Sequence, residues 1–182
     1  MNINTIKETA VALLIFSLIG SAGIAEEAKS HYREQLHFSA EGTSVRRPVP
    51  IPEDVLAILR KDDDVHDGLE HEGIAAEQIP SSWFSASAIH LNNANQVDLV
   101  VMGQGPLRGA NVITFWVFRS TSHGHELVLN APAHDLIVAN TRWKGYREIE
   151  LVSMTARQIS TVLLRFDGKG YKEFKASSEH IQ

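Results

Sequence analysis

The sequence predicts a mainly β protein with a minor helical part: an antiparallel twisted sheet or a small sandwich, with one short N-terminal helix packed on it. From residue 79 onward, short runs rich in β-branched and aromatic residues alternate with turn residues about every ten positions. No helical period separates these runs, so the strands are expected to pair as antiparallel neighbours. The expected strands cover residues 83–90, 97–102, 112–119, 125–130, 135–140, 147–153, 158–166 and 170–175.

Residues 1–25 are typical of a signal peptide. An apolar run from Ala10 to Ile19 follows a short charged start, and Gly23-Ile24-Ala25 offers small residues for cleavage. The run is shorter than the roughly 18–20 residues of a membrane-spanning helix, so cleavage after Ala25 is expected rather than a retained anchor. The chain has no cysteine, which excludes a lipid-modified cysteine and suits a periplasmic or secreted bacterial protein.

The charge of the chain argues against two classes of partner. Its net charge is −5, and its basic residues form no stripe. Such a chain is a poor candidate for binding nucleic acid or an anionic membrane surface. No membrane span is expected after cleavage, and the remaining chain is long enough for one domain with its own core.

The exported part is expected to divide into four segments. Residues 26–51 mix charge, glycine and prolines without a period and are interpreted as a flexible arm. Residues 52–78 are interpreted as a short helical segment, since a proline and two acids precede apolar positions that share one helical face. Residues 79–176 are the β-rich domain with two internal repeats, and residues 177–182 are interpreted as a disordered tail.

The β-rich part contains two copies of one pattern. In each copy a polar turn leads to an acid and an apolar strand, and a second apolar strand then leads to a glycine turn. The acids are Asp98 and Glu148, and the glycine turns are residues 122–125 and 167–170. Such units are propeller-blade-like, but two cannot close a propeller, which needs at least ~4 blades.

The first copy resembles the FG-GAP or VCBS-type repeats of β-propellers, in which an Asx-rich loop precedes an Asp and an apolar strand. The chain looks closer still to small exported bacterial proteins that carry a single such unit. The residues that carry this resemblance are Phe-Trp-Val-Phe-Arg at 115–119 and Arg-Phe-Asp-Gly-Lys-x-Tyr at 165–171. The resemblance covers residues 83–174 and implies a degenerate unit of the FG-GAP/VCBS type.

The same resemblance raises the question of calcium. In the calcium-binding form of the repeat, oxygen ligands alternate through the loop, and the equivalent residues here are His90, Asn92, Ala94 and Asp98. Two of these four cannot offer a hard oxygen ligand. For the Asn92–Asp98 loop, turn stabilisation by the asparagine side chains is therefore favoured over a calcium site.

Two further stretches have residues that could bind metal. His123, His125 and His134, with Glu126, have a spacing that zinc would permit, although a hairpin tip with solvated histidines is favoured. The acidic run at 61–73 lacks the glycine and the acid that an EF-hand needs at its sixth and twelfth positions and is favoured as a solvated helix or loop. No metal ligand and no cofactor is assigned.

No common catalytic motif appears in the sequence. It contains no Gly-x-Ser-x-Gly, no His-Glu-x-x-His and no phosphate-binding loop, and a chain without cysteine cannot be a thiol enzyme. We therefore expect a protein without enzymatic activity, and no catalytic residue is assigned.

Trp143 and Tyr146 are the candidate contact residues. They lie in a polar turn beside Arg142 and Lys144, a composition typical of a protein or glycan contact, with a core position for Trp143 as the alternative. The expected function is a binding or structural role whose partner is an envelope protein or glycan. The alternative is an inhibitor of a cell-wall hydrolase such as lysozyme, whose cleft the loop Gly103–Asn111 would plug.

Overall fold

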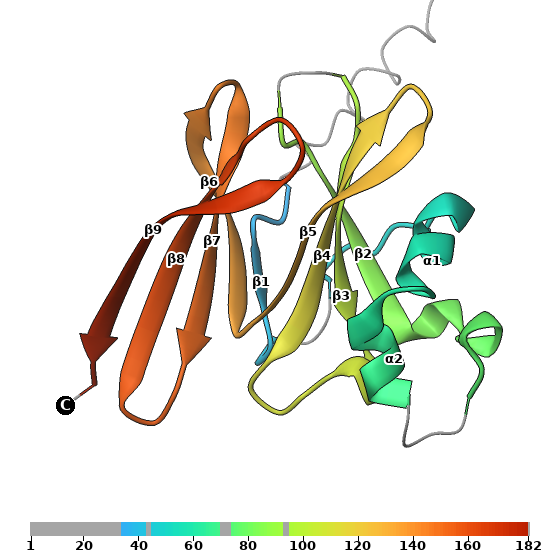
Figure 1. Ribbon diagram of the computed structural model, residues 1–182, viewed down its shortest axis with the longest axis horizontal. Helices are drawn as coiled ribbons and strands as arrows, with labels where there is room; N and C mark the ends of the chain where they lie inside the picture. Colours follow the sequence, from blue (N-terminus) through green and yellow to red (C-terminus); the bar gives the residue numbers. More distant parts are fainter. Residues whose placement is uncertain (1–33, 43–44, 70–73, 93–94, 182) are drawn as a thin grey trace, which may run out of the picture. The chain divides into compact units, whose positions relative to one another are not determined.

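The structure is a computed structural model that describes residues 34–42, 45–69, 74–92 and 95–181; the predicted signal peptide lies outside the described residues. Two antiparallel sheets dominate this part (Figure 1). The first has the strand order β2-β3-β4-β5, and the second has the order β1-β6-β7-β8-β9. The predicted mainly β fold is confirmed.

The strands of the first sheet are β2 (Phe84–Ile89), β3 (Asp98–Gly103), β4 (Ile113–Thr121) and β5 (Gly124–Ala133). Those of the second sheet are β1 (His37–Ser39), β6 (Asp135–Trp143), β7 (Tyr146–Met154), β8 (Gln158–Phe166) and β9 (Tyr171–His180). The helices are α1 (Glu53–Leu59) and α2 (Asp63–Leu69), with short 3-10 turns η1 (Ala76–Gln78), η2 (Ser81–Trp83) and η3 (Gly105–Leu107).

The two copies of the sequence repeat form corresponding sets of strands, β3-β4-β5 and β7-β8-β9. Leu99 lies opposite Phe118 in the first set, and Ile149 lies opposite Leu164 in the second. The hairpin that follows shifts its register just before Phe118 in one set and just before Leu164 in the other. The copies therefore share their strand pairing and the position of a β-bulge, which increases the local twist of each sheet.

The two sheets stack on each other, and the equivalent faces of the two repeats point in the same direction. Leu99 and Phe118 face the helical segment, whereas their counterparts Ile149 and Leu164 face the other sheet. They pack there against the opposite face of the first sheet, which carries Val117. The first sheet thus has the helices on one side and the second sheet on the other, as Figure 1 shows.

The helical segment covers the outer face of the first sheet as the sequence predicts. Val55, Leu56 and Leu59 of α1 are buried against Phe84 and Trp116, because their spacing places them on one face of the helix. None of the helices in the described ranges is long and apolar enough to cross a membrane.

The described part of the predicted flexible arm, residues 34–42 and 45–51, belongs to the fold. Phe38 in β1 is fully buried, and β1 pairs with β6. Val49 bridges to Ala86 at the free side of β2. The prediction of a loose arm is wrong for these residues, because two sheet edges and the core between the sheets accept them.

The prediction of a disordered tail at 177–182 is wrong for residues 177–180, which continue β9. Ser177 lies opposite Thr161 of β8, and His180 lies opposite Gln158. These residues are polar and exposed. Backbone pairing with β8, rather than burial of side chains, therefore accounts for this end of the strand.

Candidate binding surface

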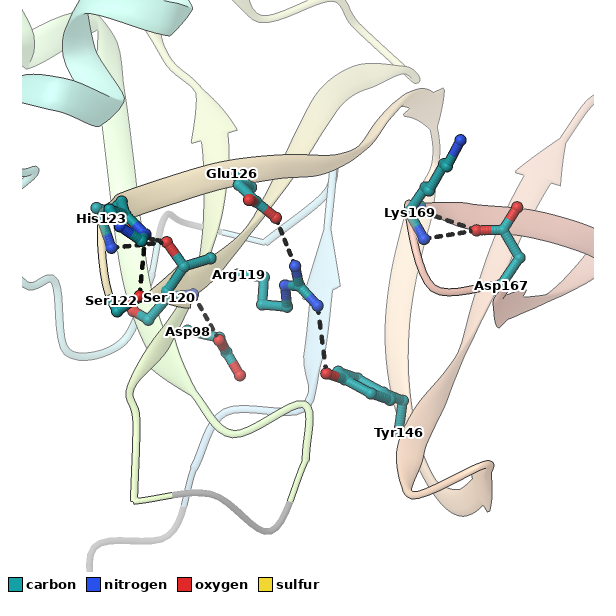
Figure 2. Close-up of polar contacts among 12 residues, drawn as sticks. Asp98, Arg119, Ser120, Ser122, His123, Glu126, Tyr146, Asp167 and Lys169 are labelled. Atoms are coloured by element: carbon teal, nitrogen blue, oxygen red, sulfur yellow. Dashed lines mark hydrogen bonds and ion pairs between the residues drawn. The ribbon is translucent and has the colours of Figure 1, made fainter.

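The acid of the first repeat fastens the loop that precedes it. Asp98 is almost completely buried, at 1% exposure. Its carboxylate accepts hydrogen bonds from the backbone N–H of Leu91 at 2.8 Å and of Ser120 at 2.9 Å, the second of which is drawn in Figure 2. Burial raises the pKa of Asp98 above its ordinary value. Both carboxylate oxygens thus hold the backbone in place.

The three candidate histidines have separate partners. Nδ1 of His125 lies 2.9 Å from Oδ2 of Asp54, and Nδ1 of His134 lies 3.0 Å from Oδ1 of Asp135. His123 contacts the neighbouring hydroxyl of Ser122. His123 and His134 lie beyond opposite ends of β5, so the structure does not bring them together. Within the described ranges, no group of three or more His, Asp or Glu side chains is arranged to hold a metal ion.

Tyr146 belongs to the region between the two sheets. Arg119 of β4 donates to Glu126 at 2.5 Å and to the Tyr146 hydroxyl at 3.4 Å, as Figure 2 shows. The Tyr146 ring packs on Phe166 with 4.3 Å between ring centroids. Tyr146 is therefore not part of an exposed aromatic pair with Trp143, because its ring packs within the second sheet and its hydroxyl contacts Arg119 of the first.

A second ionic cluster ties the N-terminal segment to both sheets. Glu34 receives a hydrogen bond from Nη1 of Arg147 at 3.0 Å and also contacts His90. Tyr171 is buried and donates its hydroxyl proton to the carbonyl of Arg147 at 2.8 Å. Burial raises the pKa of Tyr171. Glu34, Arg147 and Tyr171 therefore form bonds that hold segments of the fold together.

Trp143 is exposed, and it forms one side of a stack around Arg165. The guanidinium carbon of Arg165 lies 4.3 Å from the centroid of the Trp143 ring and 3.3 Å from that of Phe174. Trp143 is 42% exposed and Phe174 is 55% exposed. We call these three residues the aromatic–arginine surface; they come from β6, β8 and β9.

Glu148, the acid of the second repeat, holds Arg165 in this stack. Nε of Arg165 donates to Oε1 of Glu148 at 2.6 Å, and the Glu148 side chain is only 8% exposed. Hydrogen bonds from Thr141 and from Arg165 lower the pKa of Glu148 below its ordinary value. The carboxylate thus stays ionised and fixes the guanidinium between the two rings.

The loop Gly103–Asn111 is folded against the domain. Its η3 turn packs Leu107 on the cluster beneath the helices, and Arg108 donates to the carbonyls of Ala40 and Gly42. A Cβ atom at Gly103 would lie 2.8 Å from the carbonyl oxygen of Leu107, so the turn needs glycine there.

Among the hollows of the described surface are three of about 180, 270 and 390 Å³. The largest of the three lies between β5 and the turn that joins β8 to β9, and the second lies beside His134. None of the three is lined by a residue of the aromatic–arginine surface.

Comparisons with protein-family models, with curated proteins and with solved structures each found no match. The arrangement of the residues is therefore the basis for assigning a function.

Proposed function

We propose that this protein is a non-catalytic binding domain of the bacterial periplasm that holds an acidic envelope protein through the aromatic–arginine surface. The observation that carries the proposal is the position of Arg165 between two exposed rings. Trp and Arg are the residues most enriched among those that dominate protein–protein binding energy. The periplasmic location rests on the signal-peptide pattern of residues 1–25.

The charge of the surface favours an acidic partner. Within the described chain, Arg165 uses only Nε for a hydrogen bond, so its two terminal nitrogens remain available as donors. A guanidinium fork of this kind binds carboxylates in a bidentate manner. Lys144 lies 5.9 Å from the Trp143 centroid, and Lys172 lies opposite Arg165 on β9, so two more cations stand beside the stack.

A protein partner is favoured over a glycan because of the position of the surface. Sites for small ligands are concave and enclose most of the ligand. The aromatic–arginine surface lies on strands of an open sheet, outside the three hollows. The alternative function, inhibition of a hydrolase, is not supported by the loop Gly103–Asn111, because the contacts of Arg108 hold this loop against the domain.

Three polar residues near the predicted sites support a role without catalysis. Asp98, His125 and Arg119 are each engaged in bonds that join strands or helices. We also propose that the two repeats are degenerate blades of the FG-GAP/VCBS type. Their matching strand register and bulge position are what two related blades would have.

The proposal is tested by capture from envelope extract with Trp143→Ala and Phe174→Ala. Met154→Ala is the matched control, because Met154 is also an apolar side chain exposed in the second sheet, at 38%. We expect Trp143→Ala to weaken capture about thirtyfold, the effect of losing a dominant contact residue. The melting temperatures of the variants should stay close to that of the wild type. Met154→Ala should also capture the partner as well as the wild type does.

Three results would overturn the proposal. Capture by Trp143→Ala at the wild-type level would remove the surface from the interface, and a large loss of thermal stability would make Trp143 a structural residue. Loss of capture after enzymatic removal of glycans from the extract would show a glycan partner instead.

A further inference from the structure

The last strand, β9, presents a long free edge. It is ten residues long, and every residue from Lys172 to His180 is exposed. In the described chain β9 pairs only with β8, on one of its two sides. The backbone groups on its other side are a template for another strand.

The other sheet edges are less suited to pairing. β1 is only three residues long, and β2 is bridged on its free side by Val49. β5 has Pro132 in its sequence, and proline cannot donate to a neighbouring strand. Among the described strands, β9 therefore offers the longest unobstructed edge.

We propose that two copies of this protein form a dimer by pairing their β9 strands antiparallel, about a two-fold axis that passes through Ser177. The two five-stranded sheets then join into one continuous sheet. This proposal does not rest on the proposed function, because it uses the free edge and the charges of β9 and not the stack around Arg165, although Phe174 of that stack lies on the same strand.

The charge sequence of β9 selects this register. Residues that face each other in an antiparallel pair lie on the same side of the sheet, so a two-fold axis perpendicular to the sheet pairs residues of the same face. Lys175, Ser177 and Glu179 lie on one face, opposite Leu163, Thr161 and Ile159 of β8. An axis at Ser177 places Lys175 of each copy opposite Glu179 of the other.

No neighbouring register pairs Lys175 with Glu179. An axis at Ala176 would place Lys175 opposite Ser177, and an axis at Ser178 would place Ser177 opposite Glu179. An axis at Lys175 would place two lysines opposite each other, and an axis at Glu179 would oppose two glutamates; directly opposed like charges destabilise a strand pair. Within the described chain, Lys175 and Glu179 form no ion pair with another residue and lie opposite apolar residues of β8. The proposed dimer supplies each with a partner of opposite charge.

Two features that protect sheet edges, a bulge and Lys172, lie outside the proposed contact, whereas Lys175 lies inside it opposite an acid. The register shift in β8-β9 falls between the partners Glu173 and Lys175, and Lys172 precedes it. Bulges and lysines are common means of blocking edge pairing. From Lys175 to His180 the strand pairs regularly with β8 and contains no proline, so its free edge is straight enough to receive a second copy.

Sedimentation equilibrium of the purified protein over a series of concentrations tests the proposal. We expect a reversible dimer in the wild type. Lys175→Glu and Glu179→Lys should each raise the dimer dissociation constant at least about tenfold, because two like-charged pairs form across the axis. The double variant Lys175→Glu/Glu179→Lys should restore dimerisation, since it exchanges the charges within each pair.

Lys169→Glu is the control. It makes the same charge change in the exposed turn before β9 and should dimerise like the wild type. Thermal melting of every variant confirms that it is folded. A wild type that is monomeric at every concentration would overturn the proposal, as would a dimer that Lys175→Glu leaves unchanged or a double variant that fails to recover.

Discussion

Oδ2 of Asp98 lies 2.8 Å from the backbone nitrogen of Leu91, at the start of the loop that leads into β3. Oδ1 of the same side chain accepts from the backbone of Ser120 at 2.9 Å. One buried carboxylate therefore fixes both the entry to β3 and the end of β4. The acid that opens the strand in the first repeat acts here as a structural acceptor.

Removing this acceptor should destabilise the protein. In Asp98→Ala, two backbone N–H groups lose a charged partner, which should cost roughly 3 kcal/mol of unfolding free energy. Asp98→Asn keeps one acceptor oxygen and should cost less. Urea unfolding followed by far-UV circular dichroism measures both. If Asp98→Ala unfolds at the same urea concentration as the wild type, the carboxylate does not hold the loop.

The raised pKa of Asp98 predicts the direction of a pH effect. The folded protein binds the proton of the Asp98 carboxyl more tightly than the unfolded chain does. The stabilisation that comes from this tighter proton binding is complete below the ordinary pKa and is lost as pH rises through the raised pKa. The free energy of unfolding of wild type minus that of Asp98→Asn should therefore fall as pH rises across this window. Urea unfolding at several pH values between about 3 and 7 gives the slope.

Glu148 should show the opposite slope and serves as the comparison. Its pKa is lowered in the folded state, so its contribution is present above the ordinary pKa and is lost as pH falls through the lowered one. The difference between wild type and Glu148→Gln should accordingly shrink toward acid pH. Slopes of the same sign for the Asp98 and Glu148 pairs would contradict the assignment of their environments.

Two glycines at hairpin turns should differ in their tolerance of alanine. Gly124 and Gly168 both have positive φ, 117° and 110°. A Cβ at Gly124 would lie 2.7 Å from Oδ2 of Asp54, whereas nothing lies within 4 Å of one at Gly168. Gly168→Ala should cost roughly 1–2 kcal/mol from backbone strain alone. Gly124→Ala should cost more, because Asp54 must also move; equal losses in thermal unfolding would show that the contact is unimportant.

Metal ions should leave the stability unchanged. The carboxylate of Asp98 is occupied by backbone amides, and His123, His125 and His134 have separate partners. A protein that binds a ligand only when folded gains stability with the ligand concentration. We therefore expect the same melting temperature with calcium, zinc or EDTA. A rise of several degrees with either metal would identify a native-state site.

The strands were largely predictable from local pattern, and the exceptions have local causes. β5 runs on through Pro132, although proline usually ends a strand, because β5 is an edge strand and the proline lies opposite Thr114 of β4. β9 continues past residue 175 through polar residues that carry no hydrophobic signal. The buried position of Phe38 was not predictable, since it depends on pairing with β6, which lies far along the chain.

Only part of the aromatic–arginine surface could be predicted from the sequence. Trp143 stands out as an aromatic residue in a polar turn, but its partners come from strands whose register the sequence does not specify. Phe174 could have been identified as a candidate contact residue, because it is the single large apolar residue in the polar run 172–180. Tyr146 was misplaced because composition alone does not distinguish an exposed ring from one that packs on Phe166.

The most direct test of the account is photo-crosslinking in living cells, with a photoreactive aromatic amino acid placed at 143, 174 or 154. We expect one shared adduct for positions 143 and 174, and no such adduct for position 154. A pattern in which position 154 crosslinks as strongly, or in which 143 and 174 give no adduct, would contradict the claim that the aromatic–arginine surface holds a partner.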